Sequence, residues 1–384
     1  MPLYTDLESL ASGYRSFMYI CRFDAERVRG EESLFLSSRE PLSLEGGSLH
    51  ALDEVDGETP VVVSYDFVSE AYPSLRFRRS GWPQVMLMEP DEVMHGNFVR
   101  ERPPSRRYPA RVEVDTGLMS SISEAVERIR AGELLQVVLS RRIYLGQVDP
   151  FSTLSRYMEG DRSLYVYMYS DGKRLILGSS PEKVVTRSGR ELVINPIAGT
   201  RRRGRNMEED LALEEELRRD EKELLEHRML VDLARNDLGK VSIPGSVRVT
   251  SSMEVHRYAS VQHLVSTVVG RMREGIGNLD VLRAVFPAGT VSGAPKERAM
   301  ELIDLYEAYP RGAYSGAIGT VSRDRMDLAL LIRTIFRDET GTYVQAGAGI
   351  VKDSRPEREM EEMSEKIGTI MGGVIAEGLS GGQP

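Results

Sequence analysis

Cysteine and tryptophan are almost missing from this chain. Its 384 residues include one cysteine, Cys21, and one tryptophan. A single cysteine cannot form an intrachain disulfide, and it cannot supply the set of thiolates that a cysteine-based zinc site or iron–sulfur cluster needs. We therefore expect a protein of a reducing compartment, which makes it cytoplasmic.

Long hydrophobic runs are missing as well. No apolar stretch reaches the roughly 18 residues that a membrane-spanning helix needs. Residues 1–16 carry charges where a signal peptide would have an apolar core. The formal net charge is −9, and this acidic balance argues against general binding to nucleic acids. Together these features predict that neither a membrane nor a nucleic acid is a partner.

What the chain does contain is ordinary for a globular protein. Hydrophobic residues make up 41% and charged residues 28%, so there is ample material for a core. The length fits one large domain or two to three smaller ones. Three prolines in Arg102–Pro109 interrupt any helix or central strand. We therefore predict two regions, residues 1–105 and residues 106–384.

Strand and helix patterns alternate through the second region. In residues 163–170, tyrosines and aliphatic residues alternate, which is the period of a strand. Ser121 begins a capping-box pattern, and Gly132 ends the helix that follows it. Strands follow one another in hairpin-like succession as often as through helices, which predicts an α+β fold. Helices are expected over 121–132, 208–236, 295–309 and 357–367, and strands over 16–21, 60–65, 136–140, 163–170 and 327–336.

Two pairs of glutamates have the spacing of neighbours on a helix face. Glu223 and Glu226 are three residues apart in one predicted helix, and Glu359 and Glu362 are three residues apart in another. Two such faces brought together would concentrate negative charge, and a set of carboxylate oxygens favours Mg²⁺. From spacing alone, two solvated acidic helix faces are the more common case, so both interpretations stay open.

Two stretches rich in small residues are candidate sites for an anion. Residues 345–350 follow a strand-like segment, and their small side chains would let backbone N–H groups approach a ligand closely. Residues 287–295 lead into a helix start, where N–H groups can hold a carboxylate. A packed strand explains the first stretch equally well, and a tight loop explains the second.

Three polar residues stand out among apolar or turn-forming neighbours. Arg333 lies inside the apolar run 328–336, on a predicted strand face where a guanidinium needs a carboxylate from the protein or from a ligand. His263 is flanked by apolar residues and is either a base or a satisfied core histidine. Glu182 follows a short strand and is either an acid catalyst or a turn residue.

Six motifs carry a family resemblance when they are taken together. They occur in order within residues 112–372, and so many ordered motifs are not expected by chance. The chain resembles the chorismate-utilising enzymes, and within that family it is most similar to the large subunits of anthranilate synthases. The motifs are Gly178-Ser-Ser-Pro-Glu182, Pro196-Ile-Ala-Gly-Thr-Arg-Arg-Arg-Gly204, Glu226-His-Arg-Met-Leu-Val-Asp-Leu-Ala-Arg-Asn-Asp237, His263-Leu-Val-Ser266, Pro287-Ala-Gly-Thr-Val-Ser-Gly-Ala-Pro-Lys296 and Gln345-Ala-Gly-Ala-Gly-Ile-Val351.

The resemblance implies a fold and a reaction. The fold would have antiparallel sheets flanked by helices, with residues 106–384 as the chorismate-binding catalytic region and residues 1–105 as a regulatory-type region. The reaction would be that of a lyase in tryptophan biosynthesis. Ammonia would add to chorismate in an Mg²⁺-dependent step, and loss of pyruvate would then give anthranilate.

The resemblance also implies roles for individual residues. Glu182 would be the general acid that helps the ring hydroxyl leave. His263 would assist the later proton removal and the loss of pyruvate. The residues expected to hold Mg²⁺ are Glu226 and Glu362, supported by Glu223 and Glu359. The residues expected to contact the substrate are Gln136, Gly199, Thr200, Thr290, Tyr314, Arg333, Gly347, Gly349 and Lys366.

Two positions distinguish branches of the family. Relatives that add water carry a lysine base where this chain has Gln136, and a glutamine cannot take a proton from water. Aminodeoxychorismate synthases often carry a lysine that forms a covalent adduct where this chain has Ala198. Both positions favour attack by ammonia and formation of anthranilate. The alternatives are an aminodeoxychorismate synthase large subunit and, from another class, a non-catalytic regulatory protein that keeps the chorismate pocket.

A partner subunit follows from the same resemblance. Enzymes of this kind receive ammonia from a separate glutamine amidotransferase subunit, and nothing after residue 372 is long enough to supply one. We therefore expect a hetero-oligomer. Residues 35–38 and 161–168 match the tryptophan site of feedback-inhibited relatives in position but not in sequence. Either tryptophan does not inhibit this protein, or it binds through altered contacts.

Overall fold

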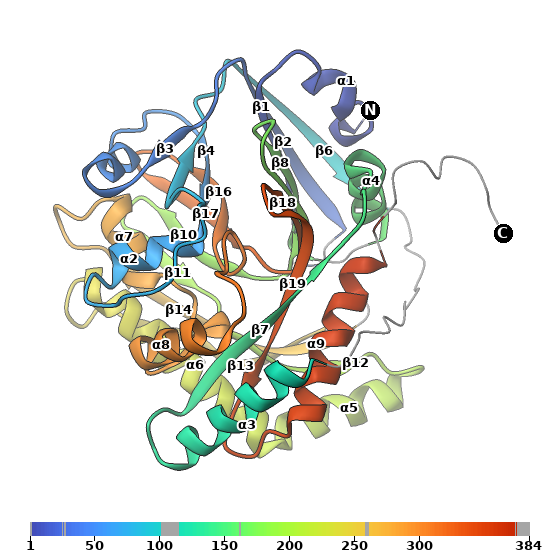
Figure 1. Ribbon diagram of the computed structural model, residues 1–384, viewed down its shortest axis with the longest axis vertical. Coiled ribbons are helices and arrows are strands. Elements are labelled where there is room, and N and C mark those ends of the chain that lie inside the picture. Colours follow the sequence, from blue (N-terminus) through green and yellow to red (C-terminus); the bar gives the residue numbers. More distant parts are fainter. Residues whose placement is uncertain are drawn as a thin grey trace.

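Two antiparallel sheets, called sheet A and sheet B below, form the body of the protein (Figure 1). The computed structural model describes residues 2–24, 26, 28–100, 115–160, 163–257, 261–372 and 374. Within these residues every pair of neighbouring strands is antiparallel. Helices pack around the sheets, so the predicted α+β class is confirmed.

Each sheet combines strands from the N-terminal, middle and C-terminal parts of the sequence. In spatial order, sheet A contains β15 (Gly293–Ala294), β7 (Gln136–Tyr144), β19 (Gly341–Ile350), β18 (Thr334–Asp338), β9 (Leu175–Ser180), β8 (Tyr165–Ser170), β1 (Ser16–Phe23), β2 (Arg29–Ser37) and β6 (Glu92–Val99). In the same way, sheet B contains β12 (Ile197–Arg202), β14 (Val261–Arg271), β11 (Glu191–Ile194), β10 (Lys183–Ser188), β17 (Arg325–Leu330), β16 (Ala317–Val321), β4 (Thr59–Val63), β5 (Val85–Leu87) and β3 (Leu42–Leu44), and β13 (Arg248–Arg257) pairs with β14.

The N-terminal strands therefore extend one edge of each sheet. Strands β1, β2 and β6 end sheet A, and strands β4, β5 and β3 end sheet B. The division into residues 1–105 and 106–384 stays a prediction. The proline-rich stretch on which it depends, residues 102–109, lies outside the described residues.

Helices and short 3-10 helices connect the strands. The helices are α1 (Leu7–Ala11), α2 (Val68–Ala71), α3 (Thr116–Arg130), α4 (Pro150–Gly160), α5 (Met207–Arg219), α6 (Glu221–Val241), α7 (Asn278–Val285), α8 (Lys296–Tyr306) and α9 (Pro356–Met371), and the 3-10 helices are η1 (Leu3–Thr5), η2 (Gly46–Asp53), η3 (Tyr65–Phe67) and η4 (Gly289–Val291). Helix α8 ends before Pro310, as predicted, but Pro295 is its N-cap and not its first helical residue. In the described part of the chain, no helix has the length and apolar character to cross a membrane.

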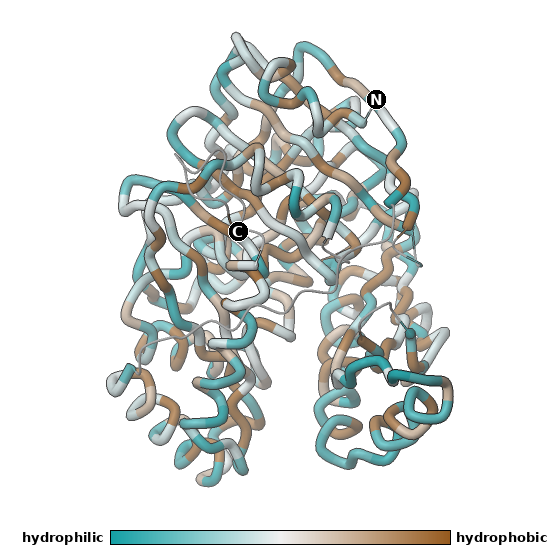
Figure 2. Tube along the Cα trace, turned by 90° about the vertical axis from the view of Figure 1, so that its right-hand side faces the viewer, coloured by the Kyte–Doolittle hydropathy of each residue, from teal (hydrophilic) through white to brown (hydrophobic). Residues whose placement is uncertain are grey.

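The alternation in β8 explains how sheet A is buried on both faces. Val166 and Met168 pack in an apolar cluster that includes residues of α4 and α9. Tyr165, Tyr167 and Tyr169 pack in a second cluster, together with residues of both sheets. The predicted two-faced strand is therefore confirmed. Figure 2 shows the same arrangement, with hydrophobic stretches running through the interior and hydrophilic ones on the outer turns.

The long helix predicted over 208–236 is wrong, because the structure has two helices there, α5 and α6. Asp220 separates them, with an extended backbone of φ −71° and ψ 101°. Its side chain accepts hydrogen bonds from the backbone N–H groups of Lys222 and Glu223, so it caps α6. The apolar periodicity continues across the break, and only the capping residue marks it.

The single strand predicted over 327–336 is also wrong. Strand β17 lies in sheet B and β18 lies in sheet A, and the chain crosses between the sheets at residues 331–333. Arg333 has a left-handed backbone there, with a φ of 51°. Gly178 of β9 leaves room for this crossing, because a Cβ at that position would lie 2.7 Å from the carbonyl oxygen of Arg333. Arg333 is therefore not a strand residue.

The helix predicted to begin at Ser121 begins five residues earlier, at Thr116. Asp115 is its N-cap, and its carboxylate accepts a hydrogen bond from the N–H of Leu118 at 3.0 Å. Ser121 lies inside the helix and donates to the carbonyl oxygen of Gly117 at 3.2 Å. The predicted end of the helix is confirmed, because Gly132 follows the C-cap with a φ of 82°.

This capping assignment predicts opposite outcomes for two alanine variants. Asp115→Ala removes the cap of α3, so we expect the free energy of unfolding to fall by about 1 kcal/mol. Ser121→Ala removes no cap and adds a better helix former, so we expect a change within about 0.5 kcal/mol. Urea denaturation followed by circular dichroism measures both. A larger loss in the Ser121 variant than in the Asp115 variant would contradict the assignment.

Candidate active site

Two crossings of the chain between the sheets lie side by side. Strand β9 passes into β10 through Glu182, and β17 passes into β18 through residues 331–333. Backbone hydrogen bonds join the two crossings, from Leu330 N to Glu182 O at 3.0 Å and from Ser179 N to Arg333 O at 3.3 Å. Glu182 and Arg333, which are far apart in the sequence, are thereby brought together.

The carboxyl group of Glu182 accepts a hydrogen bond from Thr290 of η4, at 2.6 Å. Although part of the residue is accessible to solvent, the surroundings of its carboxyl are desolvated, and this burial raises the pKa of Glu182 to about 7. The hydroxyl of Thr290 and the positive charge of Arg333 lower that pKa and so oppose the effect of burial. A large share of this carboxyl is therefore protonated at neutral pH, as a proton donor requires.

The guanidinium of Arg333 is partly exposed next to this carboxyl. Within the part of the chain that the structure describes, it has no hydrogen-bond or ion-pair partner, and its charge acts on Glu182 at longer range. The predicted strand position, where the guanidinium needed a carboxylate from the protein or from a ligand, is replaced by a partly exposed position at a crossing. An arginine in this situation can bind an anionic ligand.

A glutamine, a glutamate and a glycine meet where β7, β19 and α6 come together. Gln136 donates from Nε2 to Oε1 of Glu226 at 3.1 Å. A Cβ at Gly349 would collide with that nitrogen and would lie 3.7 Å from Oε1 of Glu226, so the contact needs a glycine. The Oε1 atom of Gln136 is buried and, among the described residues, has no hydrogen-bond partner. It is an acceptor that a ligand can use.

Gly347, two residues earlier on β19, contacts two more of the predicted residues. A Cβ at this position would lie 2.9 Å from the hydroxyl oxygen of Tyr314. Lys366 of α9 donates to the carbonyl oxygen of Gly347 at 2.8 Å and forms an ion pair with Glu362 at 2.7 Å. Residues 345–350 belong to a packed strand and are not a loop. Their small side chains nevertheless allow the close approach that the sequence suggested.

The four predicted acidic residues lie near the N-terminal ends of α6 and α9. Burial raises the pKa of Glu223, and the charge of Glu226 raises it further. Burial raises the pKa of Glu359 in the same way, and the charge of Glu362 adds to the effect. The charge of Lys222 on α6 lowers the pKa of Glu359 on α9, so the N-terminal ends of the two helices lie within electrostatic range of each other. A cation would relieve this crowding of carboxylates.

The carboxylates do not form a complete metal cage. Among the residues described by the structure, no three histidine, cysteine, aspartate or glutamate side chains lie close enough together to hold a metal ion. Mg²⁺ does not need such a cage, because it takes one or two protein carboxylates and completes its shell with water and substrate oxygens. Helices α6 and α9 each place a carboxylate-bearing turn next to β19, at Gly349 and at Gly347, and such a partial set of ligands fits this ion.

His263 of β14 faces two predicted residues of β12. Its Nδ1 atom lies 3.0 Å from the carbonyl oxygen of Gly199 and 3.0 Å from Oγ1 of Thr200. A carbonyl oxygen can only accept, so this contact assigns the hydrogen to Nδ1 and leaves Nε2 as the basic nitrogen of the neutral ring. Gly199 has a φ of 65°, and a Cβ there would lie 3.3 Å from Oε2 of Glu223, which brings β12 against α6.

The sequence analysis missed two buried ion pairs behind these residues. Glu307 and Arg311 are 2.7 Å apart, and Lys296 and Asp237 are 2.6 Å apart. The second pair links α8 to α6 and lies within the recognised motifs, which gave it no role. The spacing of four residues was the available signal for the first pair. This spacing did not indicate a pair, because a proline before Arg311 rules out a helix at that point.

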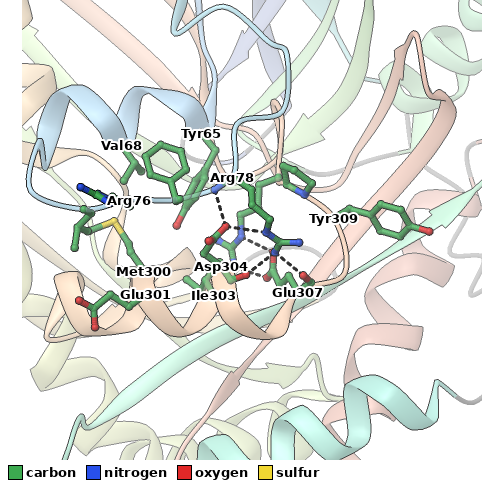
Figure 3. Close-up of a pocket in the computed structure, with 14 residues that line it drawn as sticks. Tyr65, Val68, Arg76, Arg78, Met300, Glu301, Ile303, Asp304, Glu307 and Tyr309 are labelled. Atoms are coloured by element: carbon green, nitrogen blue, oxygen red, sulfur yellow. Dashed lines mark hydrogen bonds and ion pairs between the residues drawn. The ribbon is translucent and has the colours of Figure 1, made fainter.

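A small pocket lies beside the first of these ion pairs and apart from the predicted site residues (Figure 3). It is bordered by Tyr65, by residues 75–78 and by the side of α8 that carries Met300 and Asp304. No residue of the predicted site lines it. Glu307, which Figure 3 shows at one end, connects it to the first of the buried ion pairs.

Known proteins resemble the chain over most of its length. A family profile described as chorismate binding enzyme matches residues 92–372. Anthranilate synthase component 1 of Aquifex aeolicus is 48% identical over 311 residues, which cover 80% of this chain and 60% of that protein. The protein of the same name from Aeropyrum pernix is 42% identical over 332 residues, which cover 80% of this chain and 76% of the other. The chain thus spans only part of the length of these relatives.

Solved structures show the same relationship. The crystal structure of anthranilate synthase component I from Streptococcus pneumoniae has a TM-score of 0.75 and 31% identity, and the match covers 92% of this chain and 89% of that one. The menaquinone-specific isochorismate synthase from Escherichia coli has a TM-score of 0.76 at 20% identity, with 94% and 89% covered, which is a likeness of fold alone. By its matched profile and its relatives, this chain belongs to the chorismate-binding enzyme family.

Proposed function

We propose that this chain is the large subunit of an anthranilate synthase. Chorismate and ammonia would be converted to anthranilate, pyruvate and water. The observation that carries the proposal is that Glu182, a carboxyl with a pKa raised to about 7, lies within electrostatic range of the guanidinium of Arg333, which has no partner among the described residues. This pairing offers a proton donor beside an anion-binding group. The relatives that carry the name anthranilate synthase component 1 support the same activity.

Arg333 is the proposed anchor for the enolpyruvyl carboxylate of chorismate. The backbone at Gly347 and Gly349 of β19, and Tyr314, whose hydroxyl faces Gly347 from the turn before β16, would complete this end of the pocket. Lys366 would add a positive charge, since its ammonium group is fixed beside Gly347. The remaining residues that we propose to line the pocket are Gly199, Thr200 and Thr290.

Glu226 and Glu362 are the proposed ligands of Mg²⁺, supported by Glu223 and Glu359. When bound, the ion would withdraw electron density from the ring carboxylate of chorismate. Lys366 forms an ion pair with Glu362, and Gln136 donates to Glu226. Both contacts orient the carboxylates that would hold the ion.

Glu182 would deliver its proton to the ring hydroxyl of chorismate, which then leaves as water. Hydroxide is a poor leaving group, so this step needs a proton donor. The hydrogen bond from Thr290 fixes the orientation of the carboxyl. Desolvation keeps the proton on it near neutral pH.

Gln136 and Ala198 favour ammonia as the nucleophile and anthranilate as the product. The buried Oε1 of Gln136 can accept a hydrogen bond from ammonia, whereas an amide cannot act as the base that water would need. Ala198 cannot form a covalent adduct with the substrate. After addition, Nε2 of His263 would take a proton as pyruvate leaves and the ring becomes aromatic. These residues argue against an aminodeoxychorismate synthase and against a pocket without catalysis.

A glutamine amidotransferase subunit is the proposed source of ammonia. The name component 1 of the relatives implies a second component in their enzymes. We propose a cytoplasmic hetero-oligomer of the same kind, with residues 1–105 as its regulatory-type region. The partner would supply ammonia, while the chain described here would carry out the chemistry on chorismate.

The first test of the function is a product assay. The purified chain, incubated with chorismate, Mg²⁺ and an ammonium salt, should form anthranilate and pyruvate, identified by fluorescence and mass spectrometry. Glutamine in place of ammonium should give no product, because the chain has no proposed means of releasing ammonia from it. Formation of aminodeoxychorismate, or chorismate binding without turnover, would refute the proposal.

The second test concerns Glu182. Glu182→Gln keeps the shape of the side chain but cannot donate a proton, so kcat at saturating chorismate should fall by about 10²- to 10⁴-fold. In the wild type the protonated form is active, so kcat should be level below about pH 7 and fall about tenfold per pH unit above it. Glu191→Gln, which changes an exposed glutamate of β11, is the matched control. Normal turnover of the Glu182 variant would exclude it as the acid.

The third test concerns the metal. Glu226→Gln and Glu362→Gln each remove a proposed ligand charge, so the Mg²⁺ concentration for half-maximal activity should rise at least about tenfold. Titration calorimetry with Mg²⁺ and chorismate checks the binding without turnover. Glu221→Gln and Glu365→Gln remove exposed charges from the same helices and should leave the Mg²⁺ dependence unchanged. Equal effects in all four variants would show that only the net charge matters.

A further inference from the structure

Arg311 and Glu307 form an ion pair inside the protein, with exposed fractions of 2% and 4%. The pair is bidentate: Nη2 of Arg311 lies 2.7 Å from Oε1 of Glu307, and Nε lies 3.0 Å from Oε2. The guanidinium also lies against two aromatic rings, 4.9 Å from the centre of Tyr65 and 5.5 Å from that of Tyr314. Its plane is therefore held in one orientation.

The remaining donors of Arg311 bind three other segments of the chain. Nη1 donates to the carbonyl oxygen of Val291 at 2.6 Å and to Oγ of Ser315 at 3.1 Å. Nη2 donates to the carbonyl oxygen of Val138 at 2.8 Å. One side chain thus joins η4, β7 and the turn after residue 311.

Glu307 extends the same network to β19. Its Oε1 atom accepts hydrogen bonds from the backbone N–H of Ser140 at 2.8 Å and from the Ser140 hydroxyl at 2.7 Å. That hydroxyl in turn accepts from Nε2 of Gln345 at 2.7 Å. Because Ser140 pairs with Gly347 across the two strands, the carboxylate supports the strand pair under the proposed pocket.

Every segment that the pair holds carries a residue of the proposed site. Val291 directly follows Thr290, which is the hydrogen-bond donor to Glu182. Val138 pairs with Gly349, the glycine that faces Gln136 and Glu226.

The turn after residue 311 provides the last two links. Tyr314, which faces Gly347, precedes Ser315. The backbone N–H of Ser315 donates to the carbonyl oxygen of Leu331 at 3.0 Å, at the crossing that presents Arg333. The pair therefore contacts the segments that hold three parts of the proposed site in place. These parts are the proposed acid Glu182, the anion-binding Arg333 and the glycines of β19.

Burial energy alone does not account for such a pair. Taking two charges out of water costs several kcal/mol per ion, and well-packed apolar residues of similar volume are often equally stabilising. An apolar pair, however, has no donors with which to hold three backbone segments at fixed angles. The geometry thus favours a role in positioning over a role in stability.

We propose that Arg311 is a positioning residue of the active site, which Glu307 orients and which sets the place of Thr290, Tyr314 and the Arg333 crossing relative to one another. The inference rests on the proposed function for its kinetic readout. Arg311 does not touch the substrate in this proposal and acts only through these three segments.

Arg311→Lys is the principal test. A lysine keeps the charge opposite Glu307 but cannot reach Val291, Val138 and Ser315 together. We expect a folded protein whose kcat is lower by about 10²-fold, because misplacement by about 1 Å costs that much in rate. Loss of the support of η4 weakens the hydrogen bond from Thr290 to Glu182. That bond lowers the pKa of Glu182, so the fall in kcat at alkaline pH should move to higher pH.

Thr290→Val removes the same hydrogen bond directly and should move the alkaline fall in the same direction. The double variant with Arg311→Lys should shift it no further than the larger of the single shifts, because both act on one bond. Arg333, the charged group that acts on Glu182, is unchanged in all three. Additive shifts, or a wild-type pH profile for Arg311→Lys, would overturn the proposal.

A double variant distinguishes an effect on the active site from a loss of folding. Glu307→Gln with Arg311→Met removes both charges together, so no buried charge is left unpaired. If the pair only stabilises the fold, this variant should keep wild-type kcat per folded molecule. If it positions the site, kcat should fall as in Arg311→Lys. Arg174→Met breaks an ion pair with the buried Asp171 far from the site and should change thermal stability without moving the pH profile.

A readout without turnover separates this inference from the proposed function. Carbon-13 NMR titration of labelled glutamate side chains, with Glu182→Gln for assignment, follows the protonation of Glu182 in each variant. A higher pKa of Glu182 in both Arg311→Lys and Thr290→Val supports positioning even if the wild type forms no anthranilate. An unchanged pKa in Arg311→Lys beside a raised one in Thr290→Val would overturn it.

Discussion

The pairing of two chain crossings is the constraint on which the rest of the site depends. Strands leave one sheet and enter the other at Glu182 and at residues 331–333, and backbone hydrogen bonds hold the two crossings together. Within a continuous strand, an arginine would have to point into a core or to solvent. At a crossing the backbone has left its ladder, so Arg333 can adopt a left-handed conformation. Gly178 provides the space that this conformation needs.

Charge is distributed unevenly around these crossings, and the distribution matches a substrate with two carboxylates. One end of the site carries the guanidinium of Arg333, which has no hydrogen-bond or ion-pair partner among the described residues. The other end carries the carboxylates of α6 and α9, where burial raises the pKa of Glu223 and Glu359 and the charges of Glu226 and Glu362 raise these two pKa values further. Arg333 can bind one carboxylate of a dianion directly. At the other end, the protein carboxylates would repel the second carboxylate of the dianion unless a cation lies between them. The need for Mg²⁺ in the proposal follows from this asymmetry.

The motifs predicted residues that the structure brings into contact, such as Glu182 with Thr290 and Gln136 with Glu226, whereas periodicity misplaced some of the elements that carry them. Ordered motifs identified Glu182, Thr290 and Gly349 without any knowledge of their contacts. Periodicity failed at Asp220 because one capping side chain ends a helix while the apolar pattern continues. It failed again at residues 331–333, because both sheets bury their strands and the apolar run shows no change where the chain moves between them. The pair of Arg311 with Glu307 was missed because Pro310 argues against a helix there, and the contacts of Arg311 with Val138 and Val291 were missed because these residues are distant in sequence.

The raised pKa of Glu182 also means that this carboxyl lowers the stability of the folded protein as the pH rises. Between the ordinary pKa of a glutamate and about 7, the folded state binds a proton that the unfolded state has released. The contribution of this group to stability therefore decreases as the pH rises through that range, by about 3 kcal/mol in all. Such a loss is a large fraction of the stability of a typical protein. In the proposal made above, the Glu307–Arg311 pair holds the segments around this carboxyl in place, and such support would oppose an opening of the site to water.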